Sequence, residues 1–283
     1  MLRKILKKLY YKKQWILLFS KDVDIAEVVE LEKFTKLIPP KDRFWADPFI
    51  IRESDKIYVF VEEYLYKLKK GYISVLELDS EFHLIKNTKI IENPYHMSYP
   101  FVFLVGGMYY MIPETAENNS VDLYRCNNFP YEWEIEKTLI SEVKAVDTTI
   151  CYANETYFLF TNIFSSTTKD PYAKDLFLYF SEDIFQPFKK ISCSPIVSDN
   201  SSSRCAGKIF EMNNNLYRPS QNSSKVYGGS IKISKISLID TLGYAEKKIM
   251  EIFPERGANA THTVNIDGNL IVVDQQIFRK RFG

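Results

Sequence analysis

Five short stretches of the chain combine a polar or proline-kinked step with an apolar run. They are RFWADPFI (43–50), HMSYPFVF (96–103), VDTTICY (146–152), RCAGKIF (204–210) and THTVNI (261–266). The steps carry carboxylates that can accept a proton, imidazoles that can bind or transfer one, and an arginine that can stabilise negative charge. The side chains concerned are Asp47, His96, Tyr99, Asp147, Arg204 and His262. Brought together, they would form one polar catalytic or binding site.

The five steps open repeats of one unit, which predicts an all-β, five-bladed β-propeller. From Asp47, Tyr99, Asp147, Ala206 and Thr261, the chain runs through a polar step, an apolar strand, a short turn and a second apolar strand. These starting points lie about 50 residues apart, the length of one four-stranded blade. Two further strand-like runs follow in each of the first four units. A β-sandwich is the alternative, because strand number alone does not separate the two folds.

The fifth unit ends before its outer strands, so the N-terminal part of the chain should supply them. The runs QWILLFS (14–20) and FTKLIPP (34–40) precede the first unit, with a helical or loop excursion at 22–34 between them. Pairing between the two ends of the chain would close the ring and remove an exposed sheet edge. Residues 14–283 are therefore expected to form a single propeller domain.

The innermost strand of each propeller blade lines the central channel, so the polar steps should converge on one funnel. Aromatic rings in such a funnel can pack against the apolar C–H groups of a ligand, because their faces carry negative charge density. Five such rings lie in or near the steps, with Trp45 and Tyr99 preferred: Trp45, Tyr95, Tyr99, Tyr217 and Tyr227. A structural interpretation stands beside the functional one. An aspartate before proline often caps a turn, and arginines in a channel can simply pair with its carboxylates.

Composition argues against several other classes of protein. The chain has 283 residues, 46% of them apolar, and a net charge of +1, which fits a globular domain and does not favour nucleic-acid binding. Its four cysteines form no CxxC pair, so buried free thiols are expected instead of disulfides or zinc ligands. No DxD-like metal motif falls on the funnel, and neither a metal nor another cofactor is predicted. The start of the chain lacks the apolar core of a signal peptide, which favours a cytoplasmic location.

The first residues follow a helical pattern of their own. Leu2, Ile5, Leu6 and Leu9 have the spacing of one helix face, while basic residues occupy the other face. This pattern predicts a cationic amphipathic helix over residues 1–13. Such a helix can lie on an anionic membrane surface, which would place the protein on the inner face of the membrane. Packing on the propeller or binding a partner protein are the alternatives.

A series of spaced motifs gives the chain a family resemblance. The motifs occur in this order: HMSYPFVF, MIPET, LYRCNNFPYEWEIEKTLI, VDTTI, RCAG, LYRPSQ, YGGSIKISKISLI and THTVN. From about Trp15 to Val273 the chain resembles the N-terminal propeller domain of plant glucosamine inositolphosphorylceramide transferases and their stand-alone bacterial relatives. The resemblance implies work on carbohydrates during the assembly of surface polysaccharides such as capsule or lipopolysaccharide. The plant proteins carry a distinct transferase domain, so a glycan-binding module without catalysis is one alternative.

More distantly, ADPF (46–49) and VDTT (146–149) resemble the aspartate motifs of family 43 glycoside hydrolases, which are also five-bladed. That resemblance implies Asp47 as general base and Asp147 as the carboxylate that tunes the acid and holds the sugar. The acid of those hydrolases, a glutamate, falls here on SRCAG, where Arg204 stands instead. Glu114 in MIPET or Glu63 in FVEEY could replace it, which would make the chain an inverting glycoside hydrolase.

An arginine in place of the acid favours a different leaving group. A nucleoside diphosphate needs its growing negative charge stabilised instead of protonated, and Arg204 and Arg218 could do this. Asp47 or Asp147 would then deprotonate the acceptor hydroxyl, with His96 and His262 contacting the acceptor or the phosphates. The first hypothesis is therefore a glycosyltransferase that moves a sugar from a sugar nucleotide to a glycan or lipid-linked glycan.

Overall fold

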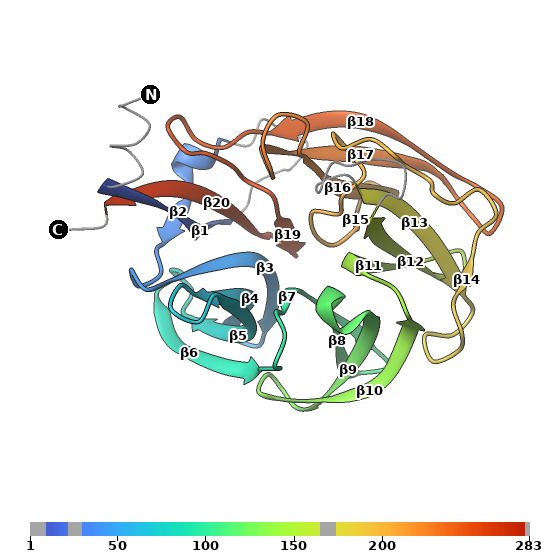
Figure 1. The fold of residues 1–283 in the computed structure, drawn as a ribbon, viewed down its shortest axis with the longest axis horizontal. Coiled ribbons are helices and arrows are strands. Elements are labelled where there is room, and N and C mark those ends of the chain that lie inside the picture. Colours follow the sequence, from blue (N-terminus) through green and yellow to red (C-terminus); the bar gives the residue numbers. More distant parts are fainter. Residues whose placement is uncertain (1–9, 22–29, 165–173, 281–283) are drawn as a thin grey trace.

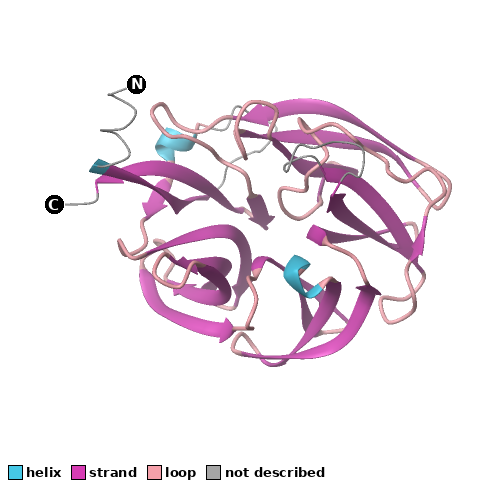
Figure 2. Cartoon of the chain, viewed as in Figure 1, coloured by secondary structure: helices cyan, strands magenta, loops and turns pink. Residues whose placement is uncertain are grey.

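The protein forms a ring of five antiparallel sheets around a common centre (Figures 1 and 2). A computed structural model describes residues 10–21, 30–164 and 174–280. Within these ranges the helical elements are two short 3-10 turns, η1 (Leu31–Lys33) and η2 (Ala116–Asn118). Each sheet has four strands, which confirms the prediction of an all-β, five-bladed propeller.

The blades follow one another along the chain. Blade 1 contains β3 (Arg43–Glu53), β4 (Lys56–Leu65), β5 (Lys70–Leu78) and β6 (Leu84–Ile91). Blade 2 contains β7 (Ser98–Val105), β8 (Met108–Glu114), β9 (Ser120–Asn128) and β10 (Glu132–Ser141). Blade 3 contains β11 (Ala145–Ala153), β12 (Thr156–Phe164), β13 (Lys174–Ser181) and β14 (Lys189–Lys190). Blade 4 contains β15 (Phe210–Met212), β16 (Asn215–Asn222), β17 (Ser230–Ile239) and β18 (Tyr244–Ile252).

Blade 5 joins the two ends of the chain, as predicted. Its sheet has the order β19 (Val264–Asp267), β20 (Leu270–Lys280), β1 (Tyr11–Lys21) and β2 (Thr35–Leu37). β1 pairs with β20 along its whole length, from Tyr11 opposite Lys280 to Lys21 opposite Leu270. The N-terminal strands therefore supply the third and outermost positions of the last blade and leave no open edge between blades 5 and 1.

Two local predictions differ from the structure. The amphipathic helix was expected over residues 1–13, but residues 11–13 belong to strand β1, because each of them is paired with β20. Residues 1–9 lie outside the described part of the chain. In blade 3 the second of the two expected outer runs forms only the short strand Lys189–Lys190, and the chain after it returns to β13 through an isolated bridge between Leu176 and Val197. No described helix is both long and apolar enough to cross a membrane.

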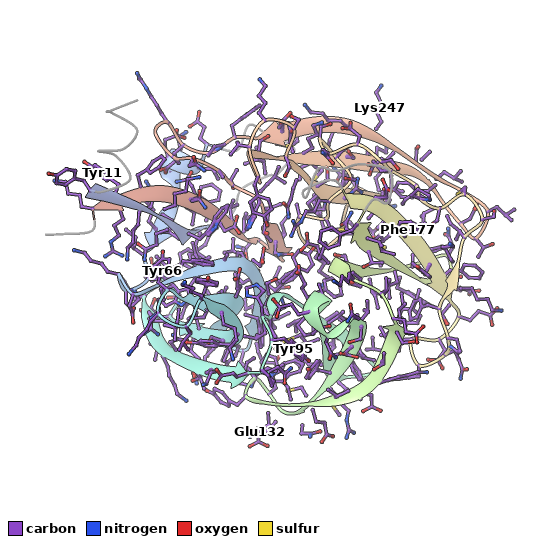
Figure 3. All side chains as sticks on the ribbon, in the orientation of Figure 1. Tyr11, Tyr66, Tyr95, Glu132, Phe177 and Lys247 are labelled. Atoms are coloured by element: carbon purple, nitrogen blue, oxygen red, sulfur yellow. The ribbon has the colours of Figure 1, made fainter. Side chains whose placement is uncertain are left out.

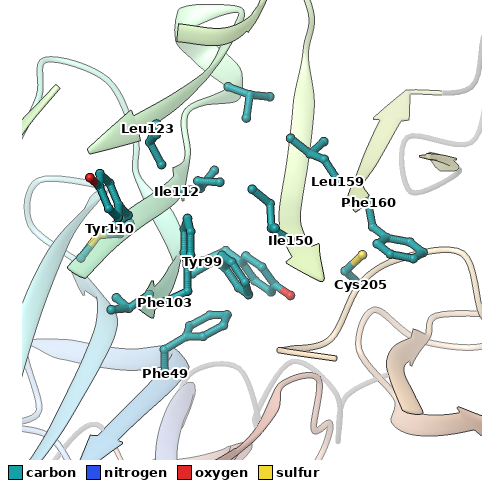
Figure 4. Close-up of a cluster of buried hydrophobic side chains, with 14 of the residues drawn as sticks. Phe49, Tyr99, Phe103, Tyr110, Ile112, Leu123, Ile150, Leu159, Phe160 and Cys205 are labelled. Carbon is teal, nitrogen blue, oxygen red and sulfur yellow. The ribbon is translucent and has the colours of Figure 1, made fainter. Parts of the chain in front are cut away.

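The core lies between the blades, where apolar faces of neighbouring sheets meet. The largest cluster joins blades 1 to 4 around Phe49, Tyr99 and Ile150 (Figure 4). Side chains fill the middle of the ring as well as the spaces between blades, while Tyr11, Glu132 and Lys247 lie at its rim (Figure 3). All four cysteines are free thiols, and three of them are buried, as predicted: Cys126, Cys151 and Cys205.

Leu17 provides a test of how much the closing strand contributes to stability. It is fully buried in β1, in the cluster shared by blades 5 and 1. Replacing it with alanine leaves a cavity at this junction, so we expect Leu17→Ala to lower the free energy of unfolding by about 2–5 kcal/mol in urea titrations. Leu242→Ala is the matched control, because Leu242 is 81% exposed. Equal unfolding midpoints for the two variants would contradict the role of β1 in closure.

Candidate active site at the centre of the ring

The polar steps of blades 1, 2 and 3 share one backbone conformation. Asp47, Tyr99 and Asp147 have φ angles of 49°, 44° and 52°, which are rare for residues other than glycine. Each of them lies at a register shift between the first two strands of its blade. A β-bulge at this point turns the side chain out of the regular alternation, and such conformations persist where the surrounding structure holds them. The repeated step in the sequence is therefore a repeated bulge at the inner end of three blades.

Asp47 is held between blades 5, 1 and 2. Its carboxylate accepts hydrogen bonds from the Thr263 hydroxyl (2.8 Å) and the Tyr99 backbone N–H (3.3 Å). Its own backbone N–H donates to Asp274 at 3.1 Å. His262 Nε2 lies 3.8 Å from Asp47 Oδ1. These contacts fix the carboxylate in a buried position at the bulge of β3.

His262 and Asp274 form a second buried pair on blade 5. His262 Nδ1 lies 2.6 Å from Asp274 Oδ2, and Asp274 Oδ1 accepts the backbone N–H groups of His262 and Thr263, both at 2.9 Å. The ring of Trp15 stacks on the imidazole at a centroid distance of 4.0 Å. Burial opposes protonation of His262, but the charges of Asp274 and Asp47 outweigh it and raise the pKa of the imidazole. His262 is therefore more readily protonated than a free imidazole, with a carboxylate on either side.

Asp147 and Arg204 form the third element of the site. The Arg204 guanidinium makes a bidentate contact with Asp147 through Nε and Nη2, and Gln221 Nε2 adds a hydrogen bond to Asp147 at 3.4 Å. Arg204 Nη2 also lies 3.9 Å from Glu114 Oε2, at the end of β8. The guanidinium carbon lies 5.1 Å from the centre of the Tyr227 ring, within cation–π distance. Carboxylates from blades 2 and 3 therefore share one arginine from blade 4.

Glu62, at the inner end of β4, completes the cluster. Its Oε1 lies 3.5 Å from His96 Nε2. The Gly71 backbone N–H donates to His96 Nδ1 at 2.9 Å, so a neutral His96 carries its proton on Nε2, on the side of Glu62. Burial and the charges of Asp47, Glu114 and Asp274 raise the pKa of Glu62 well above its usual range. Burial lowers the pKa of His96.

Negative groups outnumber positive ones in this cluster. Five carboxylates converge on it from four blades: Asp47, Glu62, Glu114, Asp147 and Asp274. The cations facing them are Arg204 and His262. Burial first, and then the charges of Asp147 and Asp274, raise the pKa of Asp47 to about 6, against the influence of His262. Full ionisation of all five carboxylates at once is therefore unfavourable.

The structure brings together most of the side chains singled out in the sequence. Asp47, Asp147, Arg204 and His262 lie in the cluster, and Glu114, Tyr227 and His96 line its more exposed side. Trp45 and Tyr99 are almost fully buried in the core instead. The Tyr99 hydroxyl contacts Thr149 Oγ1 and accepts the Gly207 backbone N–H, both at 2.8 Å, and so ties blades 2, 3 and 4 together.

Arg218 is a further predicted site residue that lies apart from the cluster. It is 1% exposed and forms a two-pronged ion pair with Glu246 of β18, with contacts of 2.8 and 2.5 Å. Its Nη2 also donates to the Ser202 carbonyl at 2.7 Å. The side chain stabilises the interior of blade 4, so Arg204 alone remains as an arginine that could meet a substrate in the cluster.

Sequence reasoning missed Glu62 and Asp274, although the chain carries a signal for both. Each second strand carries a polar residue opposite or beside the polar step of its blade: Glu62, Glu114, Asn162, Gln221 and Asp274. In FVEEY the choice between neighbouring glutamates depends on register. Glu62 lies opposite Ala46, whereas Glu63 lies opposite Trp45 and points into the blade, where it binds Arg43 and Asn87.

Asp47, His262 and Asp274 could also hold a metal ion, because their potential ligand atoms lie within 4.8 Å of one another. The hydrogen bond between His262 Nδ1 and Asp274 leaves Nε2 facing Asp47 Oδ1, an orientation common for metal-binding imidazoles. The sequence predicts no metal at this point, and that expectation stays a prediction.

A comparison with known families identifies one whose model covers most of the chain. The family model described as "Glucosamine inositolphosphorylceramide transferase 1, N-terminal" matches residues 28–267. The chain belongs to this family. Similar proteins include glucosamine inositolphosphorylceramide transferase 1 of Oryza sativa subsp. japonica, 29% identical over 72% of this chain, and that of Arabidopsis thaliana, 30% identical over 78%. The aligned parts make up 27% and 29% of those two proteins, so family members can be far longer than the matched propeller.

Solved structures with a similar fold include glycoside hydrolases. Zg3597, a family 117 glycoside hydrolase from Zobellia galactanivorans, superposes with a TM-score of 0.60 over 95% of this chain and 91% of its own. The family 62 α-L-arabinofuranosidase of Coprinopsis cinerea gives 0.59 over 84% and 94%. Sequence identity is 11% in both cases, so these structures show the shared propeller fold alone.

The pairing of Asp147 with Arg204 gives a stability test of the site. Asp147→Asn removes the closer of the two carboxylates that face the buried Arg204 guanidinium, so we expect a loss of about 3–5 kcal/mol in the free energy of unfolding. Glu134→Gln is the matched control, because its pair with Arg125 is exposed. Its unfolding midpoint should stay nearly unchanged. A similar small change for Asp147→Asn would show that the buried pair is not needed to hold the centre of the ring.

Proposed function

We propose that the chain is a carbohydrate-active enzyme that cleaves or transfers a glycosidic bond by acid–base catalysis, with Asp47 as base and Glu62 as acid. The observation that carries the proposal is the convergence of five carboxylates on two cations at the centre of the ring. Asp147 and Asp274 are each neutralised by a cation. This leaves Asp47, Glu62 and Glu114 as the carboxyl groups available for proton transfer.

The surroundings of Asp47 and Glu62 favour opposite protonation states. Asp47 accepts hydrogen bonds from Thr263 and from a backbone N–H, which favour its ionised form, and it lies beside the His262 cation. Glu62 is buried among other carboxylates, which favours its neutral, proton-donating form. A pair of carboxyl groups with different proton affinities is what displacement at a glycosidic carbon requires.

The proposed reaction follows from these roles. Asp47 removes the proton from a water molecule or an acceptor hydroxyl while the oxygen forms a bond to the anomeric carbon. The bond between that carbon and the leaving oxygen breaks, and Glu62 gives its proton to that oxygen. Arg204, held by Asp147 and Glu114, would orient the sugar through hydrogen bonds, and Tyr227 beside it offers an aromatic surface.

A nucleotide-sugar transferase is the second candidate, and Arg204 favours it. A guanidinium at the centre of the ring could stabilise a departing diphosphate. The surrounding carboxylates weigh against this function, because they repel phosphate, and Arg218 is bound to Glu246 away from the site. The observed charge balance therefore favours a sugar leaving group that takes up a proton.

The substrate setting is also part of the proposal. The plant relatives are named for glucosamine and inositolphosphorylceramide, a sugar and a lipid-linked acceptor. Membership of the same family supports a sugar substrate and a glycan or glycolipid acceptor for this chain. Assembly or trimming of bacterial surface polysaccharide next to a membrane would supply both.

The pH dependence of the reaction tests the two roles. Asp47 must be ionised, so kcat/KM should rise as the pH increases through about 6. Glu62 must be protonated, so kcat/KM should fall again once the pH exceeds the raised pKa of this group. A survey of 2,4-dinitrophenyl and methyl glycosides of common hexoses and pentoses provides the assay. A profile without a rising limb in the wild type would contradict Asp47 as base.

Glu62→Gln separates the acid from the base. Methyl glycosides need a protonated leaving oxygen, so their turnover should fall by about 10²–10⁴-fold, whereas dinitrophenyl glycosides need no acid and should keep most of their rate. Glu63→Gln is the neighbouring control on the other face of β4. An equal loss for both leaving groups would show that Glu62 is not the acid.

Calorimetry with uridine diphosphate and uridine diphosphate sugars tests the second candidate. Diphosphate-dependent binding that is lost in Arg204→Ala, but kept in Arg52→Ala at the exposed end of β3, would favour sugar transfer from a nucleotide. Binding of neutral glycans alone, with no turnover of any glycoside or sugar nucleotide, would instead favour a glycan-binding module.

A further inference from the structure

Residues 223–229 form the loop between β16 and β17, and one side of this loop contacts the catalytic cluster. Tyr227 contacts Arg204, and its ring meets the His262 imidazole edge-on at a centroid distance of 5.6 Å. Gly228 has a φ of 58°, and a Cβ there would lie 2.6 Å from His262 Cβ. Thr261 N–H donates to the Gly228 carbonyl at 2.8 Å. The glycine thus lets this loop pack directly on the site.

The other side of the same loop forms a cavity of about 430 Å³ at the end of blade 4. The residues that line it come from the loop and from the adjoining ends of β16, β17 and β18: Asn222, Ser224, Lys225, Val226, Gly229, Ser230, Glu251 and Phe253. The volume falls within the range of small-molecule sites in proteins. Tyr227 on one side and Val226 on the other make the loop a common wall of the cavity and the cluster.

One wall of the cavity is a network of polar side chains organised by Glu251. Its Oε1 accepts hydrogen bonds from Asn222 Nδ2 (2.8 Å) and Ser230 Oγ (2.5 Å), and its Oε2 binds Lys248. Asn222 Oδ1 in turn accepts the Ser224 hydroxyl at 2.7 Å. Burial alone would raise the pKa of Glu251, but these hydrogen bonds outweigh it and lower the pKa to about 2. The carboxylate therefore holds hydroxyl and amide groups in fixed orientations.

Two partly exposed apolar side chains also line the cavity. Phe253, directly after β18, is 63% exposed, and Val226 in the loop is 39% exposed. Polar groups in fixed positions next to an accessible aromatic ring suit a ligand with many hydroxyls and an apolar C–H face. Sugar rings combine these two features.

We propose that this cavity binds one sugar unit of the glycan whose bond is processed at the central cluster. This inference rests on the proposed function, because it assigns the cavity to the same substrate class. A chain crossing the 223–229 loop would meet Tyr227 on the side of the cluster and Phe253 on the side of the cavity. Longer glycans would then bind more tightly than single sugars.

Methyl NMR of the full chain tests the proposal at the cavity itself. In protein labelled at valine and leucine methyl groups, titration with cellobiose, glucose and glucosamine should shift the Val226 methyl signals. The Leu242 methyl signals, at an exposed turn of the same blade, should stay in place. Phe253→Ala should weaken the binding reported by Val226 about tenfold or more, and Asn222→Ala should weaken it as well.

The outcomes separate this proposal from the function of the cluster. Asp47→Asn should abolish turnover and leave the Val226 shifts unchanged, because Asp47 does not border the cavity. Turnover of glycosides without any Val226 shift would overturn the cavity as a sugar site and leave the enzyme intact. Val226 shifts without turnover would keep the cavity and remove the catalytic proposal. Shifts that survive Phe253→Ala undiminished would also overturn the proposed stacking.

Discussion

The antiparallel pairing of β1 with β20 holds the five blades in a closed ring, and the central site depends on that closure. Asp274 is part of β20, His262 precedes β19, and Trp15 of β1 stacks on His262. Part of the charged cluster, His262 and Asp274, therefore comes from blade 5, whose sheet joins the two ends of the chain. Asp47, from blade 1, is held by groups of blade 5 through Thr263 and Asp274. Closure of the ring therefore completes the site.

In the closed ring, the balance between buried carboxylates and buried basic side chains determines which groups of the central site can transfer a proton. Two of the five carboxylates are matched by cations, and the others share a position where full ionisation is unfavourable. Bulged, left-handed backbone at Asp47 and Asp147 directs their side chains into this position. The same bulge at Tyr99 serves packing, because its hydroxyl joins three blades. The same bulge therefore places a charged side chain in the central site in blades 1 and 3, and a packing side chain in blade 2.

The sequence was most informative where a pattern recurred. Repetition of the polar step predicted the number of blades, the closure by N-terminal strands and the convergence of Asp47, Asp147 and His262. It could not distinguish Glu62 from Glu63, because a strand exposes alternate residues and a shift of one position reverses their faces. The bulge before Phe49 sets that register, and it is visible only in the pairing. Arg218 was misplaced for a related reason, since its partner Glu246 lies on another strand.

Closure also fixes where any additional segment of the chain could be attached. Tyr11 and Lys280 are paired neighbours in blade 5, so the described propeller is entered and left at the same place on its rim (Figure 1). A domain joined before the first strand or after the last one would begin from nearly the same point in space. A domain fused at either end would therefore be attached beside blade 5.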